Sequence, residues 1–176
     1  MGLKVLSFAD LKDPPDVIED GKSFFENAFK KAKAVAEHYG ILAISDDSGL
    51  EVDALDGRPG IHSARYAGEH ATDQENNQKL LEDLQGVDDV HRQARFRCVM
   101  VAYRPDGAWV KAEGQLEGVI TSRPKGDKGF GYDPIFFVPE LGKTLAEIST
   151  EEKNKISHRA KALKALHKKL IGLLEQ

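Results

Sequence analysis

Cysteine is almost absent from this sequence of 176 residues, because Cys98 is the only one. A single cysteine excludes an intrachain disulfide, and such scarcity is typical of proteins that work in the reducing cytoplasm. We therefore expect a cytoplasmic protein. Cys98 lies in the alternating run 95–100, where a buried small hydrophobic side chain is a better expectation than a nucleophile.

Two further features are missing from the sequence. No apolar run approaches the roughly 20 residues that cross a bilayer, and no signal peptide is recognisable. Positive charge is not in excess either: 25 Lys and Arg residues stand against 29 Asp and Glu residues, for a net charge of −4 at pH 7. These absences argue against a membrane protein and against a nucleic-acid-binding protein.

What the sequence does contain is the pattern of a single α/β domain. Its 40% hydrophobic and 31% charged residues are typical of a globular protein, and no repeat or low-complexity segment divides it, so we expect one domain over residues 1–176. Capping-box spacings at Ser23–Glu26 and Thr72–Glu75 predict two helix starts. The apolar periodicity predicts helices over residues 23–40, 72–84 and from 157 onward, the last with Leu163, Leu166, Leu170, Ile171 and Leu174 buried. Strands are predicted over residues 4–7, 41–44, 50–55, 94–104, 108–113 and 116–121.

Two adjacent acids, Asp46 and Asp47, follow the apolar run 41–44 within the segment Ser-Asp-Asp-Ser-Gly. Paired carboxylates at the end of a strand are a common way to hold Mg²⁺ beside a phosphate group. A solvated turn would use the same residues. Glu26 lies in the first turn of the preceding helix, where it can serve as a cap. If that helix packs antiparallel on the strand, Glu26 reaches the sheet edge where both Asp residues end, and three carboxylates can form a metal site.

Two more segments have residue types that bind ligands. In residues 125–134, Gly129 and Gly131 flank Phe130, so the backbone can approach a ligand and the ring can stack on a base. A Gly-rich hairpin loop is the alternative. In residues 153–159, positive side chains stand at the start of a helix, where they oppose the helix dipole but can bind phosphate or base oxygens. A solvated basic surface is the alternative there.

Together these segments resemble the inosine triphosphate pyrophosphatase family. The resemblance covers nearly the whole chain, and motifs of this length and order are very specific. The matching stretches are Phe-Glu-Asn-Ala at 25–28, the segment 45–55 around the acid pair, the segment 57–66, Gly-Phe-Gly-Tyr-Asp-Pro-Ile-Phe at 129–136, and Ser-His-Arg at 157–159.

The resemblance implies an elongated α/β fold, with a mixed β-sheet flanked by helices and two lobes around a central nucleotide groove, usually as a homodimer. It also implies Mg²⁺-dependent hydrolysis of the non-standard purine nucleoside triphosphates ITP, dITP and XTP to the monophosphate and pyrophosphate, which removes them from the nucleotide pool. Asp47 falls on the position of the general base, and Glu26, Asp46 and Asp47 fall at the metal. Substrate-binding positions are implied for Ser48, Phe130, Gly131, Tyr132, Asp133, Lys153, His158 and Arg159.

The start of the sequence departs from the family. The family begins with a strand and a loop whose Thr or Ser, Asn and Lys hold the triphosphate, whereas residues 1–7 here match the family's second strand. We therefore expect slow hydrolysis, and a sheet edge that is closed by a partner chain or by local segments. Two alternative functions stay open: a catalytically weak nucleotide-binding homologue that has lost the phosphate loop, and a Mg²⁺-dependent nucleotide phosphatase.

Overall fold

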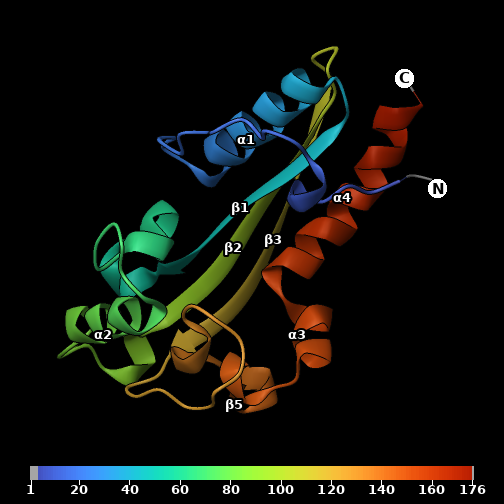
Figure 1. Cartoon of the computed structure of the whole chain (residues 1–176). Helices are drawn as coiled ribbons and strands as arrows, with labels where there is room; N and C mark the ends of the chain where they lie inside the picture. The colour runs from blue at the N-terminus through green and yellow to red at the C-terminus, as the bar shows by residue number, and fades with distance from the viewer. Residues whose placement is uncertain (1–3, 176) are drawn as a thin grey trace.

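The computed structural model describes residues 4–175 as an elongated molecule in which a long twisted sheet lies among helices (Figure 1). Five strands follow the order β1-β2-β3-β4-β5, and each pairing among them is antiparallel. The predicted α/β class is confirmed, whereas the mixed sheet that the resemblance implied is corrected to an antiparallel one within residues 4–175. The strands are β1 (Ala43–Val52), β2 (Gln93–Tyr103), β3 (Trp109–Ile120), β4 (Phe136–Val138) and β5 (Lys143–Thr144). The α-helices are α1 (Phe24–Tyr39), α2 (Asp73–Asp83), α3 (Thr150–Ile156) and α4 (His158–Leu174). The 3₁₀ helices are η1 (Phe8–Asp10), η2 (Asp53–Leu55), η3 (Gly60–Arg65), η4 (Asp89–His91), η5 (Asp133–Ile135), η6 (Pro139–Leu141) and η7 (Leu145–Glu147).

The helix α1 forms where the sequence predicts it. The Ser23 hydroxyl accepts a hydrogen bond from the backbone N–H of Glu26 at 3.2 Å, and the helix ends at Gly40, whose φ of 66° suits a residue without a Cβ. The face toward the sheet consists of small side chains, which lets the helix approach β1 and β2 closely. Three alanines of this face are fully buried: Ala28, Ala32 and Ala36.

The strand β1 corrects the prediction of two strands separated by a turn. It continues through residues 45–49 and pairs with β2 along all 10 of its residues. Gly49 is there for close packing and not for a turn, since a Cβ on it would lie 2.3 Å from the carbonyl oxygen of Gly60. Asp46 and Asp47 therefore lie in mid-strand, and their side chains point to opposite faces of the sheet.

The strand β3 likewise joins two predicted strands into one. Gly114 lies between them, and a Cβ on it would lie 2.2 Å from the carbonyl oxygen of His158, so this glycine admits the start of α4. The strand predicted over residues 4–7 is wrong. Val5 is 88% exposed there, and none of the strands described within 4–175 pairs with it. The matched stretch 1–7 also begins with residues 1–3, which lie outside the described residues.

The helix α4 begins directly after Ser157, as predicted, while the short helix α3 before it was not predicted. The sequence predicted more buried residues on α4 than the structure shows. Its buried residues form one narrow stripe, and Leu163 is 54% exposed. The stripe consists of Ala162, Leu166, Leu170 and Leu173, whereas Leu163, Ile171 and Leu174 lie outside it.

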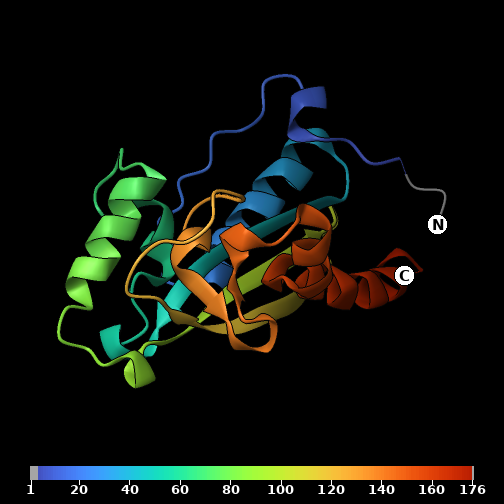
Figure 2. The ribbon, with the colours of Figure 1, turned by 90° about the horizontal axis from the view of Figure 1, so that it is seen from below.

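The helices α1 and α4 lie on opposite sides of the sheet (Figure 2). Val101 and Tyr103 of β2 pack with α1, whereas Ala102 between them packs with α4. A third and larger core lies at the other end of the sheet, where Leu50, Val52 and α2 pack with residues 132–148. Within residues 4–175, the helices are too short or too polar to span a bilayer.

Candidate active site

The structure brings the predicted substrate-binding residues together. A cavity of about 180 Å³ lies beside β1, lined by the loop 129–133 and by the starts of α2 and α4. These segments are far apart in sequence, so the fold assembles the cavity. All eight predicted substrate-binding residues line it: Ser48, Phe130, Gly131, Tyr132, Asp133, Lys153, His158 and Arg159.

The loop 129–133 holds Phe130 in an exposed position. The backbone N–H of Phe130 donates to Asp133 Oδ2 at 3.0 Å, and the same carboxylate pairs with Lys153. Gly129 has a φ of 78°, and a Cβ on it would lie 2.0 Å from Asp133 Oδ2, so only glycine fits there. The ring of Phe130 is 62% exposed, and Lys153 Nζ lies 4.4 Å from its centroid.

His158 forms the buried wall of the cavity. Its ring stacks on Phe96, with centroids 4.9 Å apart and an interplanar angle of 12°. Burial, aided by the positive charges of Arg159 and Lys153, lowers the pKa of His158 to about 4. Within residues 4–175 its Nδ1 has no hydrogen-bond partner. One wall of the cavity is therefore a neutral imidazole, whose buried Nδ1 has no partner among residues 4–175.

Asp46 lies on the cavity side of β1. Arg159 Nε donates to its Oδ2 at 3.0 Å, and Ser48 Oγ donates to the same oxygen at 3.0 Å. Burial raises the pKa of Asp46, but these hydrogen bonds and the charge of Arg159 outweigh burial and hold the pKa below its usual value. Cys98 is buried, as predicted, and its Sγ lies 3.9 Å from Asp46 Oδ2. Burial raises the pKa of the Cys98 thiol to about 11.

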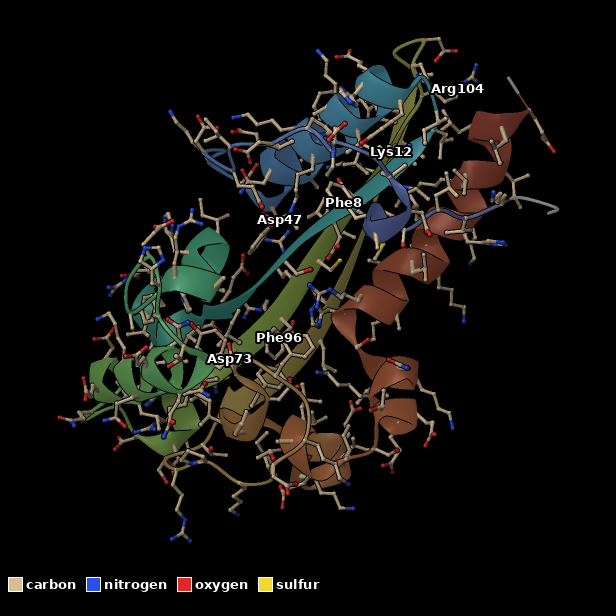
Figure 3. All side chains as sticks on the ribbon, in the orientation of Figure 1. Phe8, Lys12, Asp47, Asp73, Phe96 and Arg104 are labelled. Atoms are coloured by element: carbon tan, nitrogen blue, oxygen red, sulfur yellow. The ribbon has the colours of Figure 1, made fainter. Side chains whose placement is uncertain are left out.

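Asp47 lies on the other face, against α1 (Figure 3). Asn27 Nδ2 donates to its Oδ2 at 3.1 Å, and Lys31 Nζ lies 3.5 Å from its Oδ1. Burial raises the pKa of Asp47 above its usual value, although Asn27 and Lys31 offset part of that effect. This carboxylate is thus a better proton acceptor than an ordinary aspartate.

Glu26 acts as a helix cap in the structure. Its Oε2 accepts a hydrogen bond from the backbone N–H of Lys22 at 2.8 Å, and its side chain is exposed. Since it precedes Asn27, which contacts Asp47, Glu26 is near the Asp47 side of β1 and not the Asp46 side. The expected cluster of three acids is therefore divided by the strand.

The donor set on the α1 side suits a magnesium ion whose other ligands come from a substrate. Within residues 4–175, no three acidic, histidine or cysteine side chains gather closely enough to hold a metal ion by themselves. Mg²⁺ is typically bound by one or two carboxylates plus phosphate oxygens and water. Glu26 and Asp47 supply that number of carboxylates, and Asp46 is committed to Arg159.

Some residues of the cavity were not predicted. Phe96 was predicted only as a residue of an alternating strand, and Asp73 only as a residue of the first turn of a helix. Ser63, whose carbonyl accepts a hydrogen bond from the Tyr132 hydroxyl at 2.8 Å, lay in a matched motif without an assigned role. Only the fold reveals that these residues meet at the loop 129–133.

The fold defines an α/β protein whose cavity is lined by an exposed aromatic ring and by the cations Lys153 and Arg159. The chain belongs to the Ham1 family, whose pattern matches residues 1–169. The resemblance to the inosine triphosphate pyrophosphatase family is thereby confirmed.

Relatives and solved structures agree with that assignment. The dITP/XTP pyrophosphatase of Desulforamulus reducens is 55% identical over 163 residues, which cover 93% of this chain and 81% of that protein. The dITP/XTP pyrophosphatase of Bacillus subtilis is 49% identical over 169 residues, which cover 96% of this chain and 85% of that protein. The structure of the Staphylococcus aureus Ham1 protein matches with a TM-score of 0.90 at 45% identity, covering 96% of this chain and 87% of that one.

Proposed function

We propose that this protein is a nucleoside triphosphate pyrophosphatase that hydrolyses ITP, dITP and XTP to the monophosphate and pyrophosphate. The observation that carries the proposal is the cavity in which Phe130, His158 and Arg159 meet beside β1. Relatives that are about half identical to this chain are named dITP/XTP pyrophosphatases.

The cavity supports recognition of the purine. The exposed ring of Phe130 offers a face for stacking, and bases stack well on aromatic side chains. Arg159 and an N–H of neutral His158 can donate hydrogen bonds to a 6-keto oxygen. Adenine carries a 6-amino group instead, so it would leave these donors without partners, which discriminates strongly against ATP.

We assign the proton-transfer step to Asp47. In residues 4–175 β1 is the outer strand of the sheet, so a ligand in the cavity can extend past Ser48 around the strand toward Asp47. Asp47 takes a proton from the attacking water as the water oxygen bonds to the α-phosphorus. The bond between that phosphorus and the bridging oxygen breaks, and pyrophosphate leaves with the electron pair. The position of Asp47 against α1, with Asn27 and Lys31 as partners, supports this role.

Glu26 and Asp47 would hold Mg²⁺, which supplies positive charge beside the phosphate oxygens. Lys31, which contacts Asp47 and Glu19, adds a second positive charge on the same face. Chelation with EDTA is expected to abolish hydrolysis, and added Mg²⁺ is expected to restore it.

The proposal includes a cytoplasmic homodimer that binds neither nucleic acid nor membranes. A sequence with a single cysteine, Cys98, supports a reducing compartment, and a net charge of −4 gives no general attraction to nucleic acid. Light scattering of the purified chain gives the oligomeric state, and a monomeric mass at micromolar concentration would remove the dimer from the proposal.

The deciding experiment is product analysis. The chain is incubated with Mg²⁺ and ITP, dITP, XTP, ATP or GTP, and the products are separated by ion-exchange chromatography. We expect pyrophosphate and the monophosphate from the first three substrates, at rates well above the rate for ATP. Release of orthophosphate would favour the phosphatase alternative, and binding without turnover would favour the catalytically weak homologue.

A further inference from the structure

One residue of the base-binding loop, Gly131, is held by α2 through both of its backbone polar groups. Asp73 Oδ2 accepts a hydrogen bond from the backbone N–H of Gly131 at 2.6 Å, and Asn77 Nδ2 donates to the carbonyl oxygen of Gly131 at 3.0 Å. Asp73 and Asn77 are four residues apart, so they lie on one face of the helix. We call these two hydrogen bonds the Gly131 clamp.

The clamp carries a cost that packing alone does not explain. Asn77 is 7% exposed, and within residues 4–175 its Oδ1 has no hydrogen-bond partner, although a buried acceptor without one is destabilising. A leucine at this position would avoid that cost, because the neighbouring Leu80 shows that the helix packs against an apolar core. The hydrogen bond to Gly131 therefore explains why an asparagine, and not an apolar residue, is buried at position 77.

The clamp acts on the residue next to Phe130. Gly131 has a φ of 60°. Glycine adopts this conformation readily, but it adopts many other backbone conformations as readily, so the clamp is needed to select this one. The N–H of Phe130 is held by Asp133 and both polar groups of Gly131 are held by α2, so the backbone on either side of the Phe130 ring is fixed. The ring itself is exposed, with Lys153 Nζ 4.4 Å and the Arg159 guanidinium carbon 5.8 Å from its centroid. Figure 3 shows Asp73 where α2 meets this loop.

We propose that Asp73 and Asn77 are positioning residues for purine binding, which act through Gly131 to hold the Phe130 ring in place for the base. The inference rests on the proposed function of the cavity. Neither residue takes part in the chemistry, so their loss weakens substrate binding and leaves the hydrolytic step almost unchanged.

The kinetic test uses the pair Asp73→Ala and Asp73→Asn. Asp73 is exposed, so both variants should fold. Asparagine keeps an acceptor for the Gly131 N–H but loses the charge that stabilises the first turn of α2. Asp73→Ala should raise the KM for ITP about tenfold with kcat within about twofold of the parent, because a lost charge-assisted hydrogen bond weakens ground state and transition state alike. Asp73→Asn should restore most of the affinity.

A purely structural role of Asp73 gives a different result. A destabilised α2 would reduce the active fraction, so kcat would fall at unchanged KM, and both variants would be affected alike because both lose the charge. Gln74→Ala, at the neighbouring exposed position of the same helix, is the matched control and should leave both constants unchanged. Equal KM values for the parent and Asp73→Ala would overturn the proposal.

Hydrogen exchange tests the clamp without any substrate. The backbone amides of residues 129–133 should exchange at least about tenfold faster in Asp73→Ala than in the parent, and Asp73→Asn should stay close to the parent. If the parent fails to hydrolyse ITP, the proposed function fails while exchange still decides the clamp. Unchanged exchange in Asp73→Ala would show that the loop does not depend on α2 and would overturn the inference.

Discussion

Asp46 and Asp47 are neighbours in β1, yet their carboxylates have different surroundings because successive strand residues point to opposite faces. On the cavity side, Arg159 and Ser48 hold the pKa of Asp46 below its usual value, although burial opposes them. On the α1 side, burial raises the pKa of Asp47, and Asn27 and Lys31 offset only part of that rise. One strand therefore separates two carboxylates whose pKa values are shifted in opposite directions.

This difference indicates separate roles for the two faces. A carboxylate committed to an arginine stays ionised and orients its partner, whereas a carboxylate with a raised pKa is suited to accept a proton. On the cavity face, Asp46 is held by hydrogen bonds from Arg159 and Ser48. The α1 face presents an acid whose proton affinity the fold has increased.

The comparison predicts its largest effect for Asp47→Asn. The two side chains have nearly the same shape, but an amide cannot accept the proton, so kcat should fall by about 10²–10⁴-fold with the fold retained. Steady-state hydrolysis of ITP and the thermal unfolding midpoint measure both quantities. Asp46→Asn is the matched control and should lower kcat less than about tenfold. Near-normal turnover by Asp47→Asn, or equal losses in both variants, would show that the faces are not divided in this way.

The cavity face should also be the acid-sensitive face. His158 has a pKa of about 4 in the folded protein, below the 6.5 of an ordinary histidine, so the unfolded chain takes up the proton first as the pH falls. The stability that neutral His158 contributes is complete above pH 6.5 and is lost as the pH falls toward 4. Over that range the free energy of unfolding should fall by up to about 3 kcal/mol from this residue.

This contribution is measured by urea unfolding of the parent and of His158→Gln at a series of pH values from 7 to 4. The variant lacks the titrating imidazole, whereas the other titratable groups are the same in both proteins. The difference in unfolding free energy between the two should shrink as the pH falls. A constant difference across the range would mean that His158 is not held neutral by burial.

The third prediction concerns the ring that the cavity face presents. Phe130→Ala should raise the KM for ITP by a factor of roughly five to 150, which corresponds to about 1–3 kcal/mol of lost stacking. Phe8→Ala is a matched control, since Phe8 is 59% exposed and is not among the residues that line the cavity. Equal KM values for these two variants would remove the ring from base binding.

Local signals in the sequence were enough to predict where three helices begin. Ser23, Thr72 and Ser157 each accept a hydrogen bond from a backbone N–H three residues later. These contacts lie within one turn, so the residues that make them are visible in a short stretch of sequence. The loop 129–133 was predictable for a similar reason, because its glycines and aromatic ring are adjacent.

The continuity of β1 could not be predicted in this way. Gly49 resembles a turn residue, but its small size matters because η3 approaches it from elsewhere in the chain. The same holds for Gly114 against α4 and for Asp73, whose contact with Gly131 joins residues 58 positions apart. The residue type at these positions depends on contacts with segments far away in the sequence, and a short stretch of sequence does not show such contacts. The division of Asp46 from Asp47 follows from β1 being one strand, so it was missed for the same reason.

The smallest expected effect belongs to the ion pair between Asp46 and Arg159, which sharpens the comparison because it asks what the ionised acid of the cavity face contributes. The side chains of Asp46 and Arg159 are 35% and 46% exposed, so water screens their attraction and the pair should contribute only about 0.2–1 kcal/mol to stability. A double-mutant cycle with Asp46→Asn and Arg159→Gln, read by urea unfolding, measures this coupling. It should weaken further at about 1 M NaCl, where the Debye length is about 3 Å. The same variants should raise the KM for ITP by more than the stability coupling alone accounts for, since Asp46 also orients Arg159, whose guanidinium carbon lies 5.8 Å from the centroid of the Phe130 ring. A coupling above about 2 kcal/mol that ignores salt would mean that the pair is a structural element of the core, and Asp46 would then lose its assigned role of orienting a base-binding arginine.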